Sequence, residues 1–215
     1  MIRCMARWSF RSGAMVTCML LAACGTPQSG PREASIGGAV VQSLRGLIGP
    51  KPVKVSAAAL RSQITPALLS QLSGSVLLSE INGAGAVMAQ DGRNGAMITY
   101  IDSGRIGVSL VDGIVVGTRG LGNDLMTSDV GDLRARMRSG GTATRINRRM
   151  TGENGIVVTS FECELSQQGN QVTEACYGPS AKFENTYLLD RAGQVAASRQ
   201  WLGPETGYGT FERIR

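Results

Sequence analysis

The sequence contains no histidine. This absence removes the commonest general base of enzymes and the commonest side-chain ligand of transition metals. A Ser-His-Asp catalytic set is therefore excluded. The sequence also lacks an acidic cluster of the kind that holds calcium. It predicts no metal site and no cofactor.

No apolar run is long enough to cross a membrane as a helix, which takes about 20 residues. The apolar stretch over residues 13–21 is shorter, and it follows a segment that carries Arg3, Arg7 and Arg11 but no acid. A basic segment, a short apolar stretch and then small residues make up a secretory signal peptide. We therefore expect residues 1–23 to direct export.

The residues Leu-Ala-Ala-Cys at positions 21–24 resemble the lipobox of bacterial lipoproteins. This resemblance implies cleavage before Cys24 and acylation of Cys24. Position 25 is glycine, not the aspartate that tends to retain such proteins in the inner membrane. The resemblance thus favours a lipid anchor in the outer membrane, with the folded domain facing the periplasm. An ordinary signal peptide followed by an incidental cysteine is the alternative.

The charge of the whole chain overstates that of the mature protein. The formal net charge is +6, and it falls to +3 once the three arginines of the signal peptide are removed. A nearly balanced charge gives no reason to expect nucleic acid as a partner. Residues 24–34 are small, polar or proline and predict a tether between the lipid and the domain.

The cysteines of the mature chain are few. Cys163 and Cys176 are the two left besides Cys24 after cleavage. An even pair in an exported protein predicts a disulfide, here across or near a β-hairpin. Catalytic thiol chemistry is the alternative, but neither a histidine partner nor Cys-x-x-Cys spacing supports it.

Residues 35–73 are expected to form short helices. Apolar residues recur at helical intervals between positions 36 and 48, and a second helical piece begins near Ser56. Thr65-Pro66 is typical of a helix N-cap followed by proline in the first helical position.

From residue 74 to residue 215 the pattern changes to short strands and tight turns. Asp112-Gly113 suits a two-residue type I′ hairpin turn. Other turns are expected at 91–95, 153–155 and 190–193, and a short helix over 129–138. These features predict an all-β, antiparallel, barrel-like domain, with a sandwich as the other arrangement.

Six arginines lie close together after residue 133, with no acid among them. If the short helix and the next strand lie side by side, these residues form a cationic stripe. The candidate residues for binding a polyanion are Arg134, Arg138, Arg145 and Arg149. The ligand would be an acidic polysaccharide, lipopolysaccharide phosphates or an acidic partner surface. A solvated charged face without a ligand is the alternative.

Two further sets of residues could carry chemistry. Trp201 and Tyr208 could form a platform on which sugar rings stack, although Trp201 could instead lie in the core beside Phe183. Asp124 and Asp129 could act as an acid–base pair in glycan cleavage.

The motifs together resemble the YjbF/GfcB family of lipoproteins, which is associated with group 4 capsule and related exopolysaccharide secretion. The resemblance runs from the helices before Gly74 to the C-terminus. It is carried by the lipobox and by four segments: Asp91–Gly95, Thr118–Met126, Phe161–Cys163 and Ser198–Pro204. It implies a periplasm-facing outer-membrane lipoprotein with a β-rich domain, and it supplies no catalytic residues.

Residue pattern and resemblance together favour a non-catalytic lipoprotein that assists the assembly or export of exopolysaccharide. Its expected partners are polysaccharide secretion proteins or an acidic polysaccharide. A periplasmic glycan-modifying enzyme with a carboxylate pair, or a structural envelope-binding lipoprotein, are the alternatives.

Overall fold

The computed structural model describes residues 54–150 and 155–215. The predicted signal peptide, Cys24, the tether and the predicted helix over 35–48 lie outside these residues, as does most of the predicted turn at 153–155. The described helices are α2 (Ala57–Arg61), α3 (Pro66–Ser70) and α4 (Gly131–Arg136). The strands are β1 (Val76–Ile81), β2 (Ala84–Asn94), β3 (Met97–Ile101), β4 (Gly107–Val111), β5 (Ile114–Arg119), β6 (Leu125–Asp129), β7 (Gly141–Met150), β8 (Ile156–Gln168), β9 (Gln171–Tyr177), β10 (Lys182–Leu189), β11 (Val195–Gly203) and β12 (Gly207–Arg213).

The short helices begin where hydroxyl side chains can cap them. The Ser56 hydroxyl accepts a hydrogen bond from the N–H of Ala59 at the start of α2. Thr65 does the same for Leu68, and Pro66 occupies the first position of α3 as the sequence predicted. Each cap provides a partner for a backbone donor that the first helical turn leaves free.

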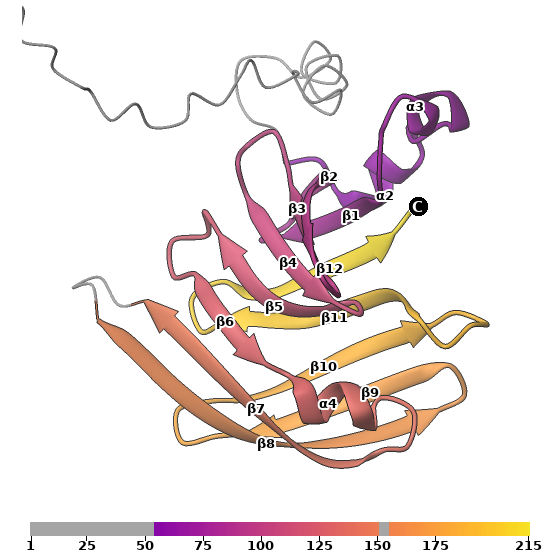
Figure 1. Ribbon diagram of the computed structural model, residues 1–215. Helices are drawn as coiled ribbons and strands as arrows, with labels where there is room; N and C mark the ends of the chain where they lie inside the picture. Colours follow the sequence, from indigo (N-terminus) through magenta and orange to yellow (C-terminus); the bar gives the residue numbers. More distant parts are fainter. Residues whose placement is uncertain (1–53, 151–154) are drawn as a thin grey trace, which may run out of the picture. The chain divides into compact units, whose positions relative to one another are not determined.

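The twelve strands form one antiparallel sheet in the order β5-β4-β3-β2-β1-β12-β11-β10-β9-β8-β7-β6. The two end strands of this order, β5 and β6, are consecutive in the chain and lie side by side (Figure 1). The N–H of Leu125 on β6 donates to the hydroxyl of Thr118 on β5. The sheet is therefore a nearly closed barrel, which confirms the barrel-like expectation over the sandwich.

Strand β5 is buried on both faces. Val115 packs with Leu77 and Phe211 in one apolar cluster, whereas Ile114 and Val116 pack with residues such as Leu133 in a second. Strand β11 contacts β5 across the interior. There the Gln200 amide donates a hydrogen bond to the carbonyl of Gly113 and accepts one from the N–H of Val115, each at 2.8 Å. Strand β5 thus contributes side chains to two apolar clusters of the core and is also tied to β11.

The turns show where local sequence rules apply. Asp112 and Gly113 both have positive φ, at 50° and 84°, and Val111 pairs directly with Ile114, so the predicted two-residue turn is confirmed. The expected loop at 91–95 is mostly wrong. Strand β2 continues to Asn94 through a bulge near Gly92, and the turn has only two residues.

Candidate functional site

The four candidate arginines do not form one surface. Arg145 and Arg149 share one face of β7 because side chains alternate along a strand, and that face points inward. The Arg145 side chain is only 3% exposed and forms an ion pair with Glu174, which is fully buried. The prediction that Arg145 contacts a polyanion is therefore wrong, because its charge is already paired inside the barrel.

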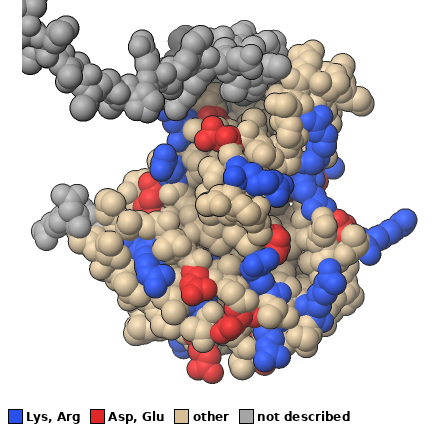
Figure 2. Space-filling model, viewed as in Figure 1, with Lys and Arg blue, Asp and Glu red and all other residues tan. Residues whose placement is uncertain are grey.

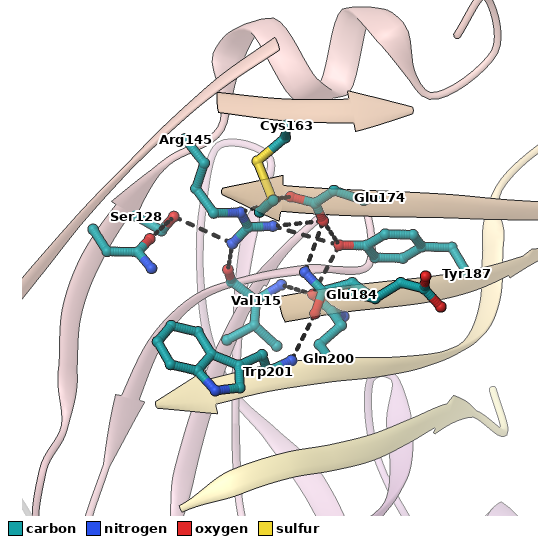
Figure 3. The surroundings of a disulfide bond; sticks show 12 residues. Val115, Ser128, Arg145, Cys163, Glu174, Glu184, Tyr187, Gln200 and Trp201 are labelled. Carbon is teal, nitrogen blue, oxygen red and sulfur yellow. Dashed lines mark hydrogen bonds and ion pairs between the residues drawn. A yellow bond between two sulfur atoms is a disulfide. The ribbon is translucent and has the colours of Figure 1, made fainter. Parts of the chain in front are cut away.

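The interior around Arg145 is a closed hydrogen-bond network (Figure 3). Arg145 Nε and Nη2 donate to the two carboxylate oxygens of Glu174 at 2.9 and 3.1 Å. The Asn185 amide and the Tyr187 hydroxyl donate to the same carboxylate at 2.7 and 2.6 Å. This polar network is buried inside the barrel, where hydrogen bonds strengthen one another.

Burial and charge set the pKa values of this network. Burial is the largest single influence on the pKa of Arg145 and lowers it. The charge of Glu174, together with Tyr187 and the hydrogen bonds to both residues, outweighs burial and raises the pKa. The pKa of Tyr187 is raised well above 10.0, first by burial and then by the charge of Glu174. The network therefore holds a protonated arginine and a neutral tyrosine at neutral pH.

A disulfide joins Cys163 on β8 to Cys176 on β9, next to the network. The two cysteines are direct register partners of the antiparallel pair, with Cα atoms 4.0 Å apart. The predicted bond is thus present. A carboxylate oxygen of Glu174 and the two sulfurs lie within 4.8 Å of one another, close enough for three ligands of one metal ion. Sulfurs in a disulfide are not thiolates, however, so this group is not a metal site.

Arg134 and Arg138 lie instead at a cleft of about 660 Å³ at one end of the barrel. The arginine cleft is lined by one acid, Asp112, and by five arginines from three parts of the chain: Arg93, Arg134, Arg138, Arg213 and Arg215. Its floor is apolar and includes Leu110, Ile114 and Phe211. A cationic rim above an apolar floor suits an anionic ligand with hydrophobic faces.

Two of the five guanidinium groups have carboxylate partners. Arg134 pairs with Asp112, and Arg213 pairs with Asp190 at 2.5 Å. The pKa of Asp190 lies below its ordinary value, mainly because the N–H of Gln194 donates to it, with Arg213 adding to the effect.

The other three arginines have no carboxylate partner among the described residues. Arg138 donates to the carbonyl of Ala192 at 3.3 Å, and Arg215 donates to backbone carbonyls that include Leu69, at 2.7 Å. The Arg93 side chain has no hydrogen bond within the described part of the chain, although its backbone pairs with β3. Figure 2 shows Lys and Arg side chains along the right-hand part of the face drawn, with fewer Asp and Glu among them. The arginine cleft therefore keeps a positive field.

Sequence reasoning missed Arg93, Arg213 and Arg215 as members of this site. Each is separated in the chain from the arginine-rich segment and does not belong to a long run of basic residues. Only the closure of the sheet, which places β2 and β12 next to α4 across the cleft, brings them together.

Trp201 does not offer an open face to a sugar ring. Its ring is stacked on Phe183, with centroids 4.5 Å apart and planes 12° apart, and the Arg149 guanidinium lies over it at 5.3 Å. Tyr208 is its register partner on β12 and is itself covered by Arg199 at 3.5 Å. The predicted stacking platform is therefore wrong, and the alternative of Trp201 beside Phe183 is correct.

The two candidate carboxylates have separate local roles. Asp124 accepts hydrogen bonds from the backbone N–H groups of Gly120 and Leu121, at 2.8 and 3.0 Å, and so holds the β5–β6 turn. Asp129 accepts from Gly131 at 3.2 Å, just before α4. Both contacts are typical of aspartates that stabilise turns.

A family model gives the family of the chain, and a solved structure gives its fold. The model of the family described as "Group 4 capsule polysaccharide lipoprotein gfcB, YjbF" matches residues 53–214. The crystal structure of the hypothetical lipoprotein YmcC from Escherichia coli (K12) is similar, with a TM-score of 0.60 and 17% identity over 81% of this chain and 95% of that chain. A comparison with curated proteins finds no match. Within the described residues, no helix is long and apolar enough to span a membrane.

Proposed function

Since the chain belongs to the YjbF/GfcB family of group 4 capsule polysaccharide lipoproteins, we propose that it assists the assembly or export of an acidic exopolysaccharide without catalysing a reaction. In this proposal Cys24 anchors it in the outer membrane and the domain faces the periplasm. The polysaccharide is held, at least transiently, in the arginine cleft.

One observation supports the proposal most directly: five arginines line a single cleft that contains one acid. Opposite charge attracts an acidic polymer to such a surface and raises its rate of encounter. The apolar floor suits the hydrophobic faces of sugar rings. The partly exposed guanidinium groups can exchange one carboxylate for another, as a moving chain requires.

The filled interior favours surface binding over passage through the barrel. The Arg145–Glu174 network and the Gln200 contact between β11 and β5 occupy the space that a threaded chain would need. A polysaccharide would therefore lie against the domain.

The test combines binding with secretion. The acidic exopolysaccharide of the same organism is titrated into the purified parent protein and into an Arg93→Gln/Arg138→Gln variant. These two arginines have no carboxylate partner, so their removal should not disturb folding. Binding should weaken in the variant, and in the parent it should weaken as salt rises, since the Debye length is about 8 Å at physiological ionic strength.

Arg136→Gln is the matched control, because Arg136 is exposed on α4 between two cleft residues but does not line the cleft. Deletion of the gene should reduce secreted polysaccharide. The parent and Arg136→Gln should restore it, and the double variant should not. Full secretion in the deletion strain would refute the proposed function.

A further inference from the structure

Arg149 lies in a second cavity, at the opposite end of the barrel from the arginine cleft. The arginine cleft is lined by residues near the start of β5 and β11, whereas this cavity is lined by residues at their ends, such as Arg119 and Trp201. We refer to it as the Trp201 cavity. Its volume is about 1040 Å³, which exceeds the range of about 300–1,000 Å³ of small-molecule pockets and leaves room for an oligosaccharide.

The Arg149 guanidinium is only partly satisfied there. Its Nη1 donates to the carbonyl of Asn123 at 3.1 Å. Its Nη2 is buried and has no acceptor among the described residues. Burial lowers the pKa of Arg149, although the charge of Asp124 opposes this. A buried cationic donor without an acceptor is unfavourable and rare in folded proteins, so it calls for an explanation.

The surroundings of this guanidinium keep it beside Trp201. Trp201, over which it lies, is held by stacking on Phe183 and by edge contact with Phe161. Gly203 has a φ of 148°, and a Cβ atom at this position would lie 2.8 Å from Arg149 Nη1. The backbone therefore leaves room for the guanidinium beside Trp201.

We propose that the Trp201 cavity binds a carboxylate-bearing sugar residue, with Arg149 Nη2 donating to the carboxylate. A carboxylate supplies the acceptor that Nη2 lacks, and its planar shape matches the guanidinium fork. Binding turns the covered Nη2 toward the ligand. The hydroxyl groups of Thr159 and Ser180 and the amide of Asn147 line the same cavity and suit sugar hydroxyls. The choice of a saccharide over another carboxylate rests on the proposed function.

Trp201 provides a signal specific to this cavity. The chain has two tryptophans, and the other, Trp8, lies in the predicted signal peptide. Fluorescence of the mature protein in detergent micelles therefore reports on Trp201. The probe is a short oligogalacturonate, with its neutral methyl ester as the matched ligand control. The titrations use the Arg93→Gln/Arg138→Gln background, so that the arginine cleft contributes little.

The acidic oligomer should change the fluorescence saturably, and the neutral ester should bind about tenfold more weakly or not at all. Arg149→Gln should lower the affinity for the acidic oligomer by about tenfold. Arg149→Lys should also weaken binding, because lysine keeps the charge but loses the fork. Arg148→Gln is the matched control variant. Arg148 directly precedes Arg149 on β7, but its side chain lies on the other face of the strand and does not line the cavity. Its affinity should equal that of the background protein.

Three results would overturn the inference: no response to the oligogalacturonate, equal binding of acid and ester, or unchanged affinity in Arg149→Gln. Circular dichroism confirms that each variant is folded. The titration measures binding to the purified protein, whereas the proposed function is tested by the polysaccharide that cells release. A negative titration therefore refutes this inference without refuting the proposed function.

Discussion

Arg145 and Glu174 form a bidentate ion pair inside the barrel, with Nε···Oε1 and Nη2···Oε2 distances of 2.9 and 3.1 Å. The residues come from β7 and β9, which are separated in the sheet by β8. Each charge is acceptable there only because the other is present. The pair therefore links non-adjacent strands and makes the fold sensitive to either residue.

Replacing Arg145 with methionine should lower the free energy of unfolding by about 3–5 kcal/mol, because Glu174 then stays buried without its cation. Urea denaturation followed by circular dichroism measures this change. The double variant Arg145→Met/Glu174→Leu should be less destabilised than the sum of the two single variants. Arg136→Met, at an exposed position, serves as the control. A loss below about 1 kcal/mol for Arg145→Met would contradict the structure, since that is the range of exposed pairs.

Stability should fall at alkaline pH through Tyr187, which faces Glu174, Arg145 and Gln200. Its pKa in the folded protein is raised well above 10.0, so the folded protein holds this proton more tightly than the unfolded chain does. The resulting stabilisation is complete below about pH 10 and is lost as the pH rises further toward the folded-state pKa.

Urea unfolding between about pH 8 and pH 11 measures this slope. Tyr187→Phe should reduce the alkaline slope, although it also lowers stability at neutral pH by removing a donor to Glu174. Tyr177→Phe is the matched control, because Tyr177 is 54% exposed. Equal slopes in the parent and in Tyr187→Phe would show that another group is responsible.

The disulfide should stabilise the domain by constraining the unfolded chain. Its cysteines are 13 residues apart, and closing a loop of this size contributes about 3 kcal/mol. Cys163→Ser/Cys176→Ser should therefore lower the free energy of unfolding, and reduction of the parent should do the same. Mass spectrometry of the unreduced protein should find the two peptides linked. Two alkylatable thiols in protein isolated from the periplasm would argue against the bond.

Cys24→Ser should abolish acylation and release the protein in soluble form. The prediction comes from the lipobox at 21–24, which lies outside the described residues. Labelling of cells with an alkyne fatty acid and fractionation of their membranes measure both effects. Cys163→Ser is a suitable control for the labelling, since it removes a cysteine of the disulfide and leaves the predicted acylation site in place. Acylation that persists in Cys24→Ser would place the lipid elsewhere.

Local elements could be read from the sequence because their causes are local. Thr65-Pro66 begins a helix through one side-chain cap and one fixed φ. Asp112-Gly113 makes a two-residue turn because both residues tolerate positive φ. The Cys163–Cys176 bond could be predicted because so few thiols remain in an exported chain. None of these features depends on which strands later become neighbours.

Which face of β7 points into the barrel could not be predicted from local sequence. The alternation of the strand places Arg145 and Arg149 on one face, but it does not say which face is inside. Hydrophobicity suggests that arginines face water. Arg145 is an exception because Glu174, on β9 and 29 residues further along the chain, provides a buried carboxylate as its partner. A buried charge can be recognised only together with its partner, and the sheet register decides that pairing.

The sequence by itself determined the antiparallel β class, the Asp112-Gly113 turn, the disulfide pair and the family, because these follow from short-range pattern and motif order. The tertiary structure decided the sites. Closure of the sheet joined Arg93, Arg134, Arg138, Arg213 and Arg215 into one cleft, buried Arg145, and placed Arg149 over Trp201 at the other end. The physical reason is that charge acts through space, so its role depends on neighbours that only the folded chain supplies.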